Sequence, residues 1–154
     1  PASRESVLTV ESGSLSAAIT PAETEVLEGA TFDVRGEVTC NAVDGCSEVT
    51  LTVEKGGGTA LGSGTTPFAT SGNNPKSCGN MNDGGSCSKT WTVEATGDGT
   101  SDYGIQVTAS SSDSGISDDT ATDTVTIEAP SVSISGISAG GSSTGLEAGF
   151  DYSS

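Results

Sequence analysis

The 154-residue sequence predicts an all-β fold in which two sheets pack into a sandwich. Short runs alternate between apolar and polar residues with a period of two, which is the pattern of half-buried strands. Turns rich in Gly, Ser, Asn and Asp separate these runs, and no stretch has the period of an amphipathic helix. Hydrophobic residues make up 32% of the chain and aromatic residues 4%, so we expect thin layers of β-branched side chains.

The first half of the chain contains three strand signals. Residues 15–19 alternate up to Pro21, whose missing N–H group is tolerated where a strand ends. Residues 32–40 give the clearest signal, because inward-type residues occupy every second position over nine residues. Residues 49–53 alternate in the same way, and the three glycines at 56–58 end that strand.

The second half begins with a long stretch, residues 59–88, that has little periodicity apart from a possible short strand at 66–70. A loop of this length inside a compact domain is usually functional or needs a covalent tie. Further strands are predicted at 91–95, 103–109 and 122–128. The predicted core of the sandwich comprises Phe32, Val34, Val38, Leu51, Trp91, Val93, Ile105 and Val107.

Four cysteines in a chain without histidine indicate disulfides formed in an oxidising compartment. Three pairings are possible for four cysteines. We expect Cys40 to pair with Cys46 and Cys78 with Cys87, because each bond closes a short polar loop that contains glycine. A zinc site is disfavoured, since four-thiolate sites usually have two to four residues between paired cysteines.

The formal net charge of −16 excludes several classes of partner. A chain with 21 acidic and 5 basic residues cannot neutralise phosphates, so we expect neither nucleic acid nor anionic membrane as a partner. No apolar run reaches 18 residues, and we therefore expect no membrane insertion. Together with the disulfides, this composition predicts an extracellular or cell-surface location.

Enzymatic activity is not expected, because the absence of histidine removes the usual general base. No cofactor and no definite metal site is assigned. Calcium is the best alternative, since it takes several oxygen ligands from carboxylates on flexible loops, although no twelve-residue loop signature is present. The acidic residues that bracket the strand at 103–109 are Asp98, Asp102, Asp113, Asp118, Asp119 and Asp123.

Sugar binding would require exposed aromatic side chains. Trp91 lies on an alternating strand and is therefore expected in the core rather than on a sugar-binding face. We expect Phe68, Tyr103 and Tyr152 to be exposed, but they are too few and too dispersed to outline a glycan groove. The acceptor motif for N-linked glycans is absent, while O-linked glycans on the many Ser and Thr residues stay an open alternative.

Three stretches carry a resemblance to a known group of proteins: TPAETEVLEGATFDV at 20–34, EVTCNAVDGCSEVTLTV at 37–53, and TTPFATSGNNPKSCGNMNDGGSCSKTWTVEATGDG at 65–99. They resemble the immunoglobulin-like modules of secreted archaeal cell-surface proteins, over residues 14 to 129. The resemblance implies an immunoglobulin-like β-sandwich from a surface layer, fibre or adhesin, and it transfers no catalytic residue.

Strand-forming segments flank the predicted sandwich. We divide the chain into an N-terminal strand segment at 1–13, a sandwich at 14–130 and a C-terminal segment at 131–154. The last of these echoes residues 19–34, because Ile137-Ser138-Ala139 and Leu146-Glu147-Ala148-Gly149-Phe150-Asp151 repeat the order of its apolar and acidic residues. The apolar residues expected to contact another subunit are Val7, Leu8, Val10, Val132, Ile134, Ile137, Leu146 and Phe150.

Apolar strand segments outside a complete domain must be buried somewhere, since natural sheets avoid exposed edges. We therefore expect an extracellular structural subunit that polymerises with identical subunits, each terminal segment adding a strand to a neighbour. Head-to-tail contacts of this kind build an open filament. The alternatives are a repeat module of a larger surface-layer or stalk protein, and an adhesive or carbohydrate-binding module.

Overall fold

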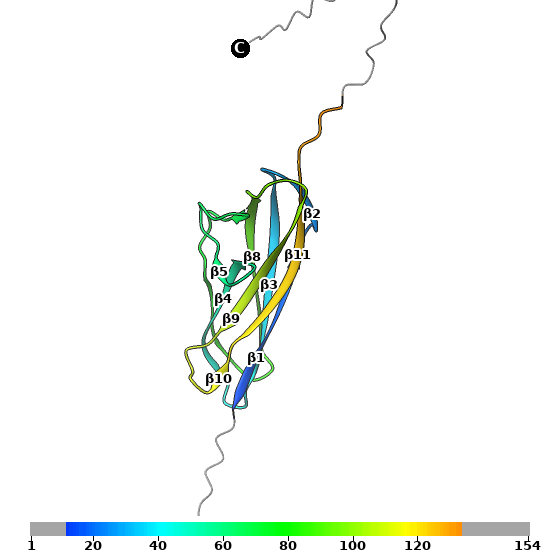
Figure 1. Ribbon diagram of the computed structural model, residues 1–154. Coiled ribbons are helices and arrows are strands. Elements are labelled where there is room, and N and C mark those ends of the chain that lie inside the picture. Colours follow the sequence, from blue (N-terminus) through cyan, green and yellow to red (C-terminus); the bar gives the residue numbers. More distant parts are fainter. Residues whose placement is uncertain (1–11, 134–154) are drawn as a thin grey trace, which may run out of the picture.

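The computed structural model describes residues 12–133, which form two packed β-sheets (Figure 1). The first sheet has the strand order β10-β1-β3-β8-β6, and the second has the order β2-β11-β9-β4-β5, with β7 also paired to β4. No helix long and apolar enough to cross a membrane occurs in this part of the chain. The strands are β1 (Gly13–Pro21), β2 (Glu25–Leu27), β3 (Thr31–Asn41), β4 (Cys46–Lys55), β5 (Thr59–Ala60), β6 (Phe68–Ala69), β7 (Lys76–Met81), β8 (Ser86–Ala95), β9 (Ser101–Ser110), β10 (Ile116–Ser117) and β11 (Asp119–Glu128).

The first two strands pair with the last two, one pair at each end of the molecule. β1 pairs with β10 in parallel, with Gly13 opposite Ile116, and β2 pairs with β11 in parallel, with Val26 opposite Ile127. Between these points the chain changes sheet, from β1 to β2 and from β10 to β11. All other strand pairs are antiparallel.

The core lies between the two sheets, and its side chains come from the alternating rows that the sequence displays. Trp91 is its largest side chain and is 1% exposed. The indole packs over Gly36 of β3, where an added Cβ would lie 3.2 Å from Trp91 Cζ3 and 2.8 Å from Val107 Cγ1. Glycine is therefore required at the centre of this strand. The other residues predicted for the core are also buried: Phe32, Val34, Val38, Leu51, Val93, Ile105 and Val107.

The stretch at 59–88 is more ordered than its sequence predicts. It contains β5, β6 within the expected 66–70 strand, and the unpredicted six-residue β7. The residues of β7 do not alternate between apolar and polar, so the sequence shows no clear period of two there. The strand pairs with β4 through irregular register shifts. The prediction that Phe68 is exposed is wrong: its ring is fully buried and packs edge-on against Phe32 and Tyr103, which is itself half-buried.

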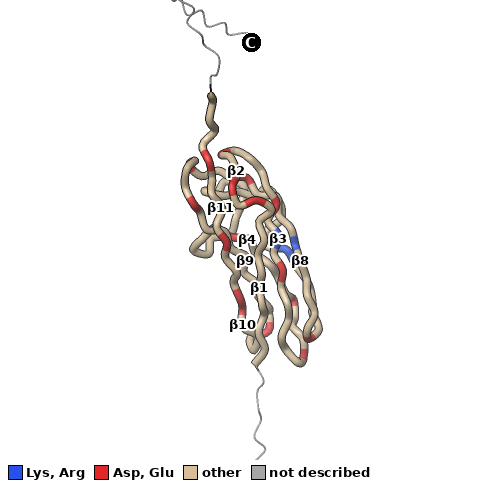
Figure 2. Tube along the Cα trace, turned by 90° about the vertical axis from the view of Figure 1, so that its right-hand side faces the viewer, with Lys and Arg blue, Asp and Glu red and all other residues tan. Residues whose placement is uncertain are grey.

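The sandwich is elongated along its strands, as two views at right angles show (Figures 1 and 2). The described chain enters at the end of the sandwich where β1 begins and leaves at the opposite end, after β11 (Figure 1). We call these the entry end and the exit end. The hairpin loop between β3 and β4 and the loop between β9 and β10 lie at the entry end, whereas β2 lies at the exit end.

Candidate assembly interface

Both predicted disulfides are present. Cys40–Cys46 closes the hairpin between β3 and β4 at the entry end. Cys78–Cys87 joins β7 of the second sheet to β8 of the first, and it ties down the long stretch that the sequence marked as needing a covalent link. One long side of the sandwich is thereby closed by a covalent bond.

Side chains also cap the backbone on this β7–β8 side. β8 pairs with β6 only at its last residues, so the rest of its outer edge has no strand partner between residues 12 and 133. The ammonium group of Lys76 donates to the carbonyl of Thr90 at 2.6 Å, and the hydroxyl of Thr70 donates to the carbonyl of Thr92 at 2.9 Å. Lysine on an edge and covered edge groups are devices that stop another chain from pairing there. We infer that this side is protected against strand addition.

The opposite long side, between β1 and β11, is capped in a similar way by carboxylates. The amide N–H of Ala17 donates to Asp119 Oδ2 at 2.7 Å, and that of Thr124 donates to Asp123 Oδ1 at 2.8 Å. Asp119 and Asp123 occupy inward positions of β11 and are half-buried. Inward-pointing charges at a sheet edge also discourage pairing with another chain. Both long sides of the sandwich therefore resist strand addition along much of their length.

Among residues 12–133, the short strand β2 has one edge without a strand partner, and it lies at the exit end. It pairs with β11 on one side and ends the second sheet on the other. The backbone N–H of Glu28 and the carbonyl of Thr24 both bond to β11, so by alternation the N–H and C=O of Glu25 face away from it. Leu27 in this strand is 50% exposed. β2 thus combines an unpaired edge with an exposed apolar side chain.

A cavity of about 380 Å³ opens at the entry end, and we call it the entry cavity. Its wall residues come from the chain start, the β3–β4 hairpin and the β9–β10 loop, which places the cavity between the two sheets. The apolar wall residues are Ala42, Val43 and Ile116, and the polar ones are Ser12, Asn41, Asp44, Ser47 and Asp113.

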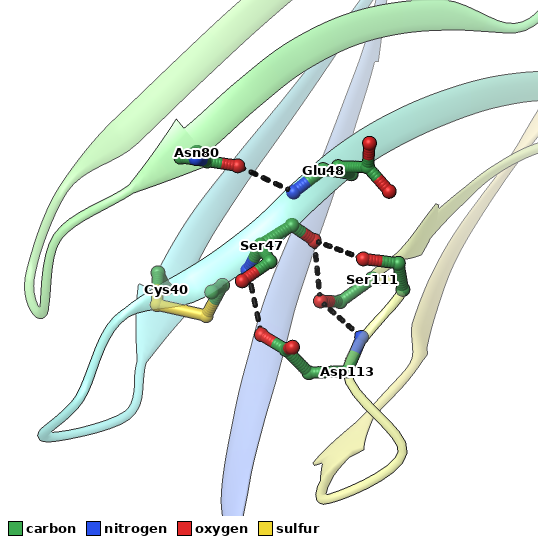
Figure 3. The surroundings of a disulfide bond; sticks show 8 residues. Cys40, Ser47, Glu48, Asn80, Ser111 and Asp113 are labelled. Carbon is green, nitrogen blue, oxygen red and sulfur yellow. Dashed lines mark hydrogen bonds between the residues drawn. A yellow bond between two sulfur atoms is a disulfide. The ribbon is translucent and has the colours of Figure 1, made fainter.

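Hydrogen bonds hold two walls of the entry cavity together (Figure 3). The N–H of Ser47 donates to Asp113 Oδ2 at 2.7 Å, and the hydroxyl of Ser111 donates to the Ser47 carbonyl at 2.7 Å. On the far side of the same strand, the N–H of Glu48 donates to Asn80 Oδ1 at 2.9 Å. Because β4 is bonded on both sides here, next to the Cys40–Cys46 disulfide, the cavity has fixed walls.

The large apolar side chains that stay exposed within residues 12–133 lie at the two ends of the molecule. Val43 is 75% exposed at the entry end, whereas Leu27 and Val132 are 50% and 90% exposed at the exit end. Val132 belongs to the predicted contact set. The other members lie outside the described residues: Val7, Leu8, Val10, Ile134, Ile137, Leu146 and Phe150.

The six aspartates considered for calcium are not gathered into one site. Asp98 and Asp102 lie near the start of β9 at the exit end, while Asp113, Asp118 and Asp119 lie near the entry end. No group of three His, Cys, Asp or Glu residues that could hold a metal occurs between residues 12 and 133. Asp102 Oδ1 instead accepts a hydrogen bond from Thr126 at 2.7 Å. Calcium binding remains an untested prediction.

Acidic residues are spread over both ends and the sides of the sandwich, whereas basic residues are few (Figure 2). One ion pair, between Arg35 and Glu37 at 2.8 Å, is formed in the described part of the chain. Trp91, Phe32 and Phe68 are buried and Tyr103 is half-buried, so residues 12–133 present no row of exposed aromatic side chains for a sugar.

No protein-family model and no curated protein sequence matches the chain. Several solved structures are similar in fold. The CARDB domain of the PF1109 protein from Pyrococcus furiosus, crystallised in complex with di-metal ions, is 14% identical with a TM-score of 0.54; the match covers 80% of this chain and all of that one. Its solution NMR structure gives 14% identity and a TM-score of 0.58 over 77% and 98% of the two chains.

A further match is Escherichia coli alpha-2-macroglobulin, with 13% identity and a TM-score of 0.54 over 75% of this chain and 7% of that chain. At such low identity these likenesses establish the fold. The prediction of an all-β, immunoglobulin-like sandwich is confirmed by the two sheets and by the CARDB structures. The chain is therefore an immunoglobulin-like β-sandwich module with two local disulfides, and the large exposed apolar residues of its described part lie at the two ends.

Proposed function

We propose that the protein is an extracellular structural subunit that joins further copies of itself end to end into a filament. The observation that carries this proposal is the placement of the chain ends: the described chain enters at one end of an elongated sandwich and leaves at the other (Figure 1). Copies stacked head to tail bring the exit end of one next to the entry end of the next. Such contacts do not close on themselves, so they repeat along a fibre.

Terminal segments that add as strands to a neighbour would make these junctions strong, because the backbone supplies a row of hydrogen bonds. The capped long sides restrict where such a strand can pair. Within the described part of the chain β2 keeps one unpaired edge, and it lies at the exit end that meets the entry end of the next copy. Residues 1–11 of that next copy, which include the apolar Val7, Leu8 and Val10, are the matching donor segment.

An extracellular location is supported by the two disulfides and by the acidic, Ser- and Thr-rich composition. Disulfides persist in oxidising compartments, and a high net charge keeps a surface hydrated. The sequence contains no histidine to act as the usual general base, and we propose a structural role without cofactor or nucleic-acid partner.

Truncation at either end tests this function. We compare the full chain with a chain lacking residues 1–11 and with a chain ending at Pro130, because β1 begins at Gly13 and β11 ends at Glu128. The full chain is expected to form fibres in negative-stain images, and each truncated chain should elute as a monomer in size-exclusion chromatography. Circular dichroism controls for an intact sandwich. If both truncated chains still build normal fibres, the terminal segments are not the junction.

Salt should promote assembly. Each copy carries a net charge of −16, and acidic residues line both ends that must meet, including Asp44 at the entry end and Glu28 at the exit end. Screening shortens the reach of this repulsion from about 14 Å in 50 mM salt to about 3 Å in 1 M salt. We expect longer assemblies in 1 M than in 50 mM sodium chloride, measured by light scattering. Assembly that weakens with salt would show that attraction between opposite charges, not apolar and backbone contact, joins the copies.

A repeat module of a longer surface protein is the second candidate, favoured by the same placement of the ends and by the echo of residues 19–34 in residues 137–151. The intact mass of the native polypeptide separates the two. A mass near 15.1 kDa, apart from glycans, supports the filament subunit, and a much larger mass supports the repeat module.

A further inference from the structure

We infer that the entry cavity of one copy binds Val132 of a second copy, so that an apolar side chain from the exit end plugs into the entry end at each junction. This inference deepens the proposed end-to-end assembly and rests on it. Both sides of the proposed contact belong to the described residues: the cavity walls on one side and the segment after β11 on the other.

The entry cavity has room for one apolar side chain and its flanking backbone, and its walls combine apolar with polar residues. Its volume is about 380 Å³, and Ala42, Val43 and Ile116 supply apolar wall. Val43 is 75% exposed, so covering it would remove apolar surface from water. The polar wall residues, including Asn41 and Ser47, can hydrogen-bond the backbone that carries such a side chain.

Val132 is the matching group at the other end of the molecule. It is 90% exposed and lies four residues past the last residue of β11, in a segment assigned to no strand. Pro130, two residues earlier, has a fixed backbone φ angle and so restricts the directions in which the segment can leave the sandwich. Leu27, the other exposed apolar residue at this end, is held in β2 and is half covered.

Position excludes a contact within one molecule. The entry cavity and Val132 lie at opposite ends of the sandwich (Figure 1), so a Val132 side chain can reach only the cavity of another copy. The same polarity repeats at every junction: each copy offers one cavity and one valine. A single contact of this kind therefore fixes the head-to-tail order of the filament.

Engineered disulfide formation tests the contact. All four native cysteines between residues 12 and 133 are paired, so two added cysteines give unique thiols. A full-length Val43→Cys protein is mixed with a full-length Val132→Cys protein and oxidised under air. We expect the 43–132 heterodimer to form severalfold faster than the heterodimer of Val132→Cys with Thr124→Cys, whose added thiol lies exposed on a long side. The double variant Val43→Cys/Val132→Cys should give a ladder of dimers, trimers and longer chains on non-reducing gels.

Equal rates for the 43–132 and 124–132 pairs would overturn the inference. If the full chain nevertheless forms fibres that need its terminal segments, the proposed function stands and only the entry cavity contact is wrong. If fibres are also absent, both fail. A 43–132 cross-link that forms only after residues 1–11 are removed would show that the N-terminal segment fills the cavity in the native protein, and it would also overturn the inference.

A second pair of variants reads out the contact without cysteines. Val132→Asp places a charge at an exposed position, so the sandwich itself should fold as before. In the contact, however, the new charge would have to leave water and enter a cavity already lined by Asp44 and Asp113. Val132→Ile keeps the apolar character. We expect Val132→Asp to raise the protein concentration needed for assembly severalfold and Val132→Ile to leave it unchanged. Identical behaviour of the two variants would contradict the inference.

Discussion

Replacing Trp91 with alanine is expected to lower the free energy of unfolding by about 3–5 kcal/mol, the usual cost of removing a large buried aromatic side chain. The indole is 1% exposed and fills the space between Gly36 of the first sheet and Val107 of the second. Its N–H also donates to the carbonyl of Asn73 at 3.2 Å, so the truncation removes a hydrogen bond from the loop before β7. Urea unfolding measures the loss. Trp91 is the sole tryptophan of the chain, so the variant has no tryptophan fluorescence to follow. Far-UV circular dichroism is therefore the suitable signal for both proteins.

The matched control is Thr90→Ala in the same strand. Its side chain is exposed, and its carbonyl still accepts the hydrogen bond from Lys76, so we expect a change within about 0.5 kcal/mol. A loss of less than about 1 kcal/mol for Trp91→Ala, well below the range for buried aromatics, would contradict the packing described here.

Removing the Cys78–Cys87 disulfide by a double alanine substitution is expected to cost about 2–3 kcal/mol, the loop-closure entropy for a bond that spans nine residues. A second consequence follows from its position. The bond joins β7 to β8, so its loss should let β7 move away and uncover the outer edge of β8. Uncovered edges pair with other chains, and the variant should therefore self-associate laterally, which light scattering would detect.

The control for this prediction is the double alanine variant of Cys40 and Cys46. That bond closes a six-residue separation within one hairpin, so its removal should also destabilise the sandwich but expose no long edge. If both variants scatter light equally, the Cys78–Cys87 bond does not guard the β7–β8 side.

The strands that could be predicted from the sequence are those whose inward residues repeat every second position. β3, β8 and β9 contain the alternating runs predicted at 32–40, 91–95 and 103–109, and each strand is longer than its run. The local disulfides were also predictable from short polar loops. β7 was missed because its neighbours hold it in place: a bulged ladder with β4 and the bond to Cys87 order a segment without periodicity.

Phe68 shows the same limit for a single side chain. Its surroundings in sequence are polar and rich in glycine, so nothing local indicates burial, yet tertiary contacts place it against Phe32 and Tyr103. Burial of an aromatic ring in a loop-like segment depends on contacts that are distant in sequence.

The capped sides and the entry cavity were not predicted, because they depend on residues far apart in the chain. Asp119 caps Ala17 across 102 positions, and Asp113 bonds to Ser47 across 66. One signal was available: Asp119 and Asp123 fall on the inward register of a strand that ends in Val125 and Ile127. Charged residues at inward positions of a strand indicate a sheet edge that is protected against pairing with another chain. This pattern would have predicted that the β1–β11 side is such an edge.

The axial repeat of fibres made by the full chain tests end-to-end assembly most directly. Strands of about ten residues rise roughly 33 Å, so with its turns the sandwich is roughly 40 Å long, whereas five strands side by side span about 24 Å. Stacking along the strands predicts an axial repeat of roughly 40 Å in images of the fibres or in fibre diffraction. A repeat of about 24 Å, with strands running across the fibre axis, would show that the copies join through their long sides and would contradict the account.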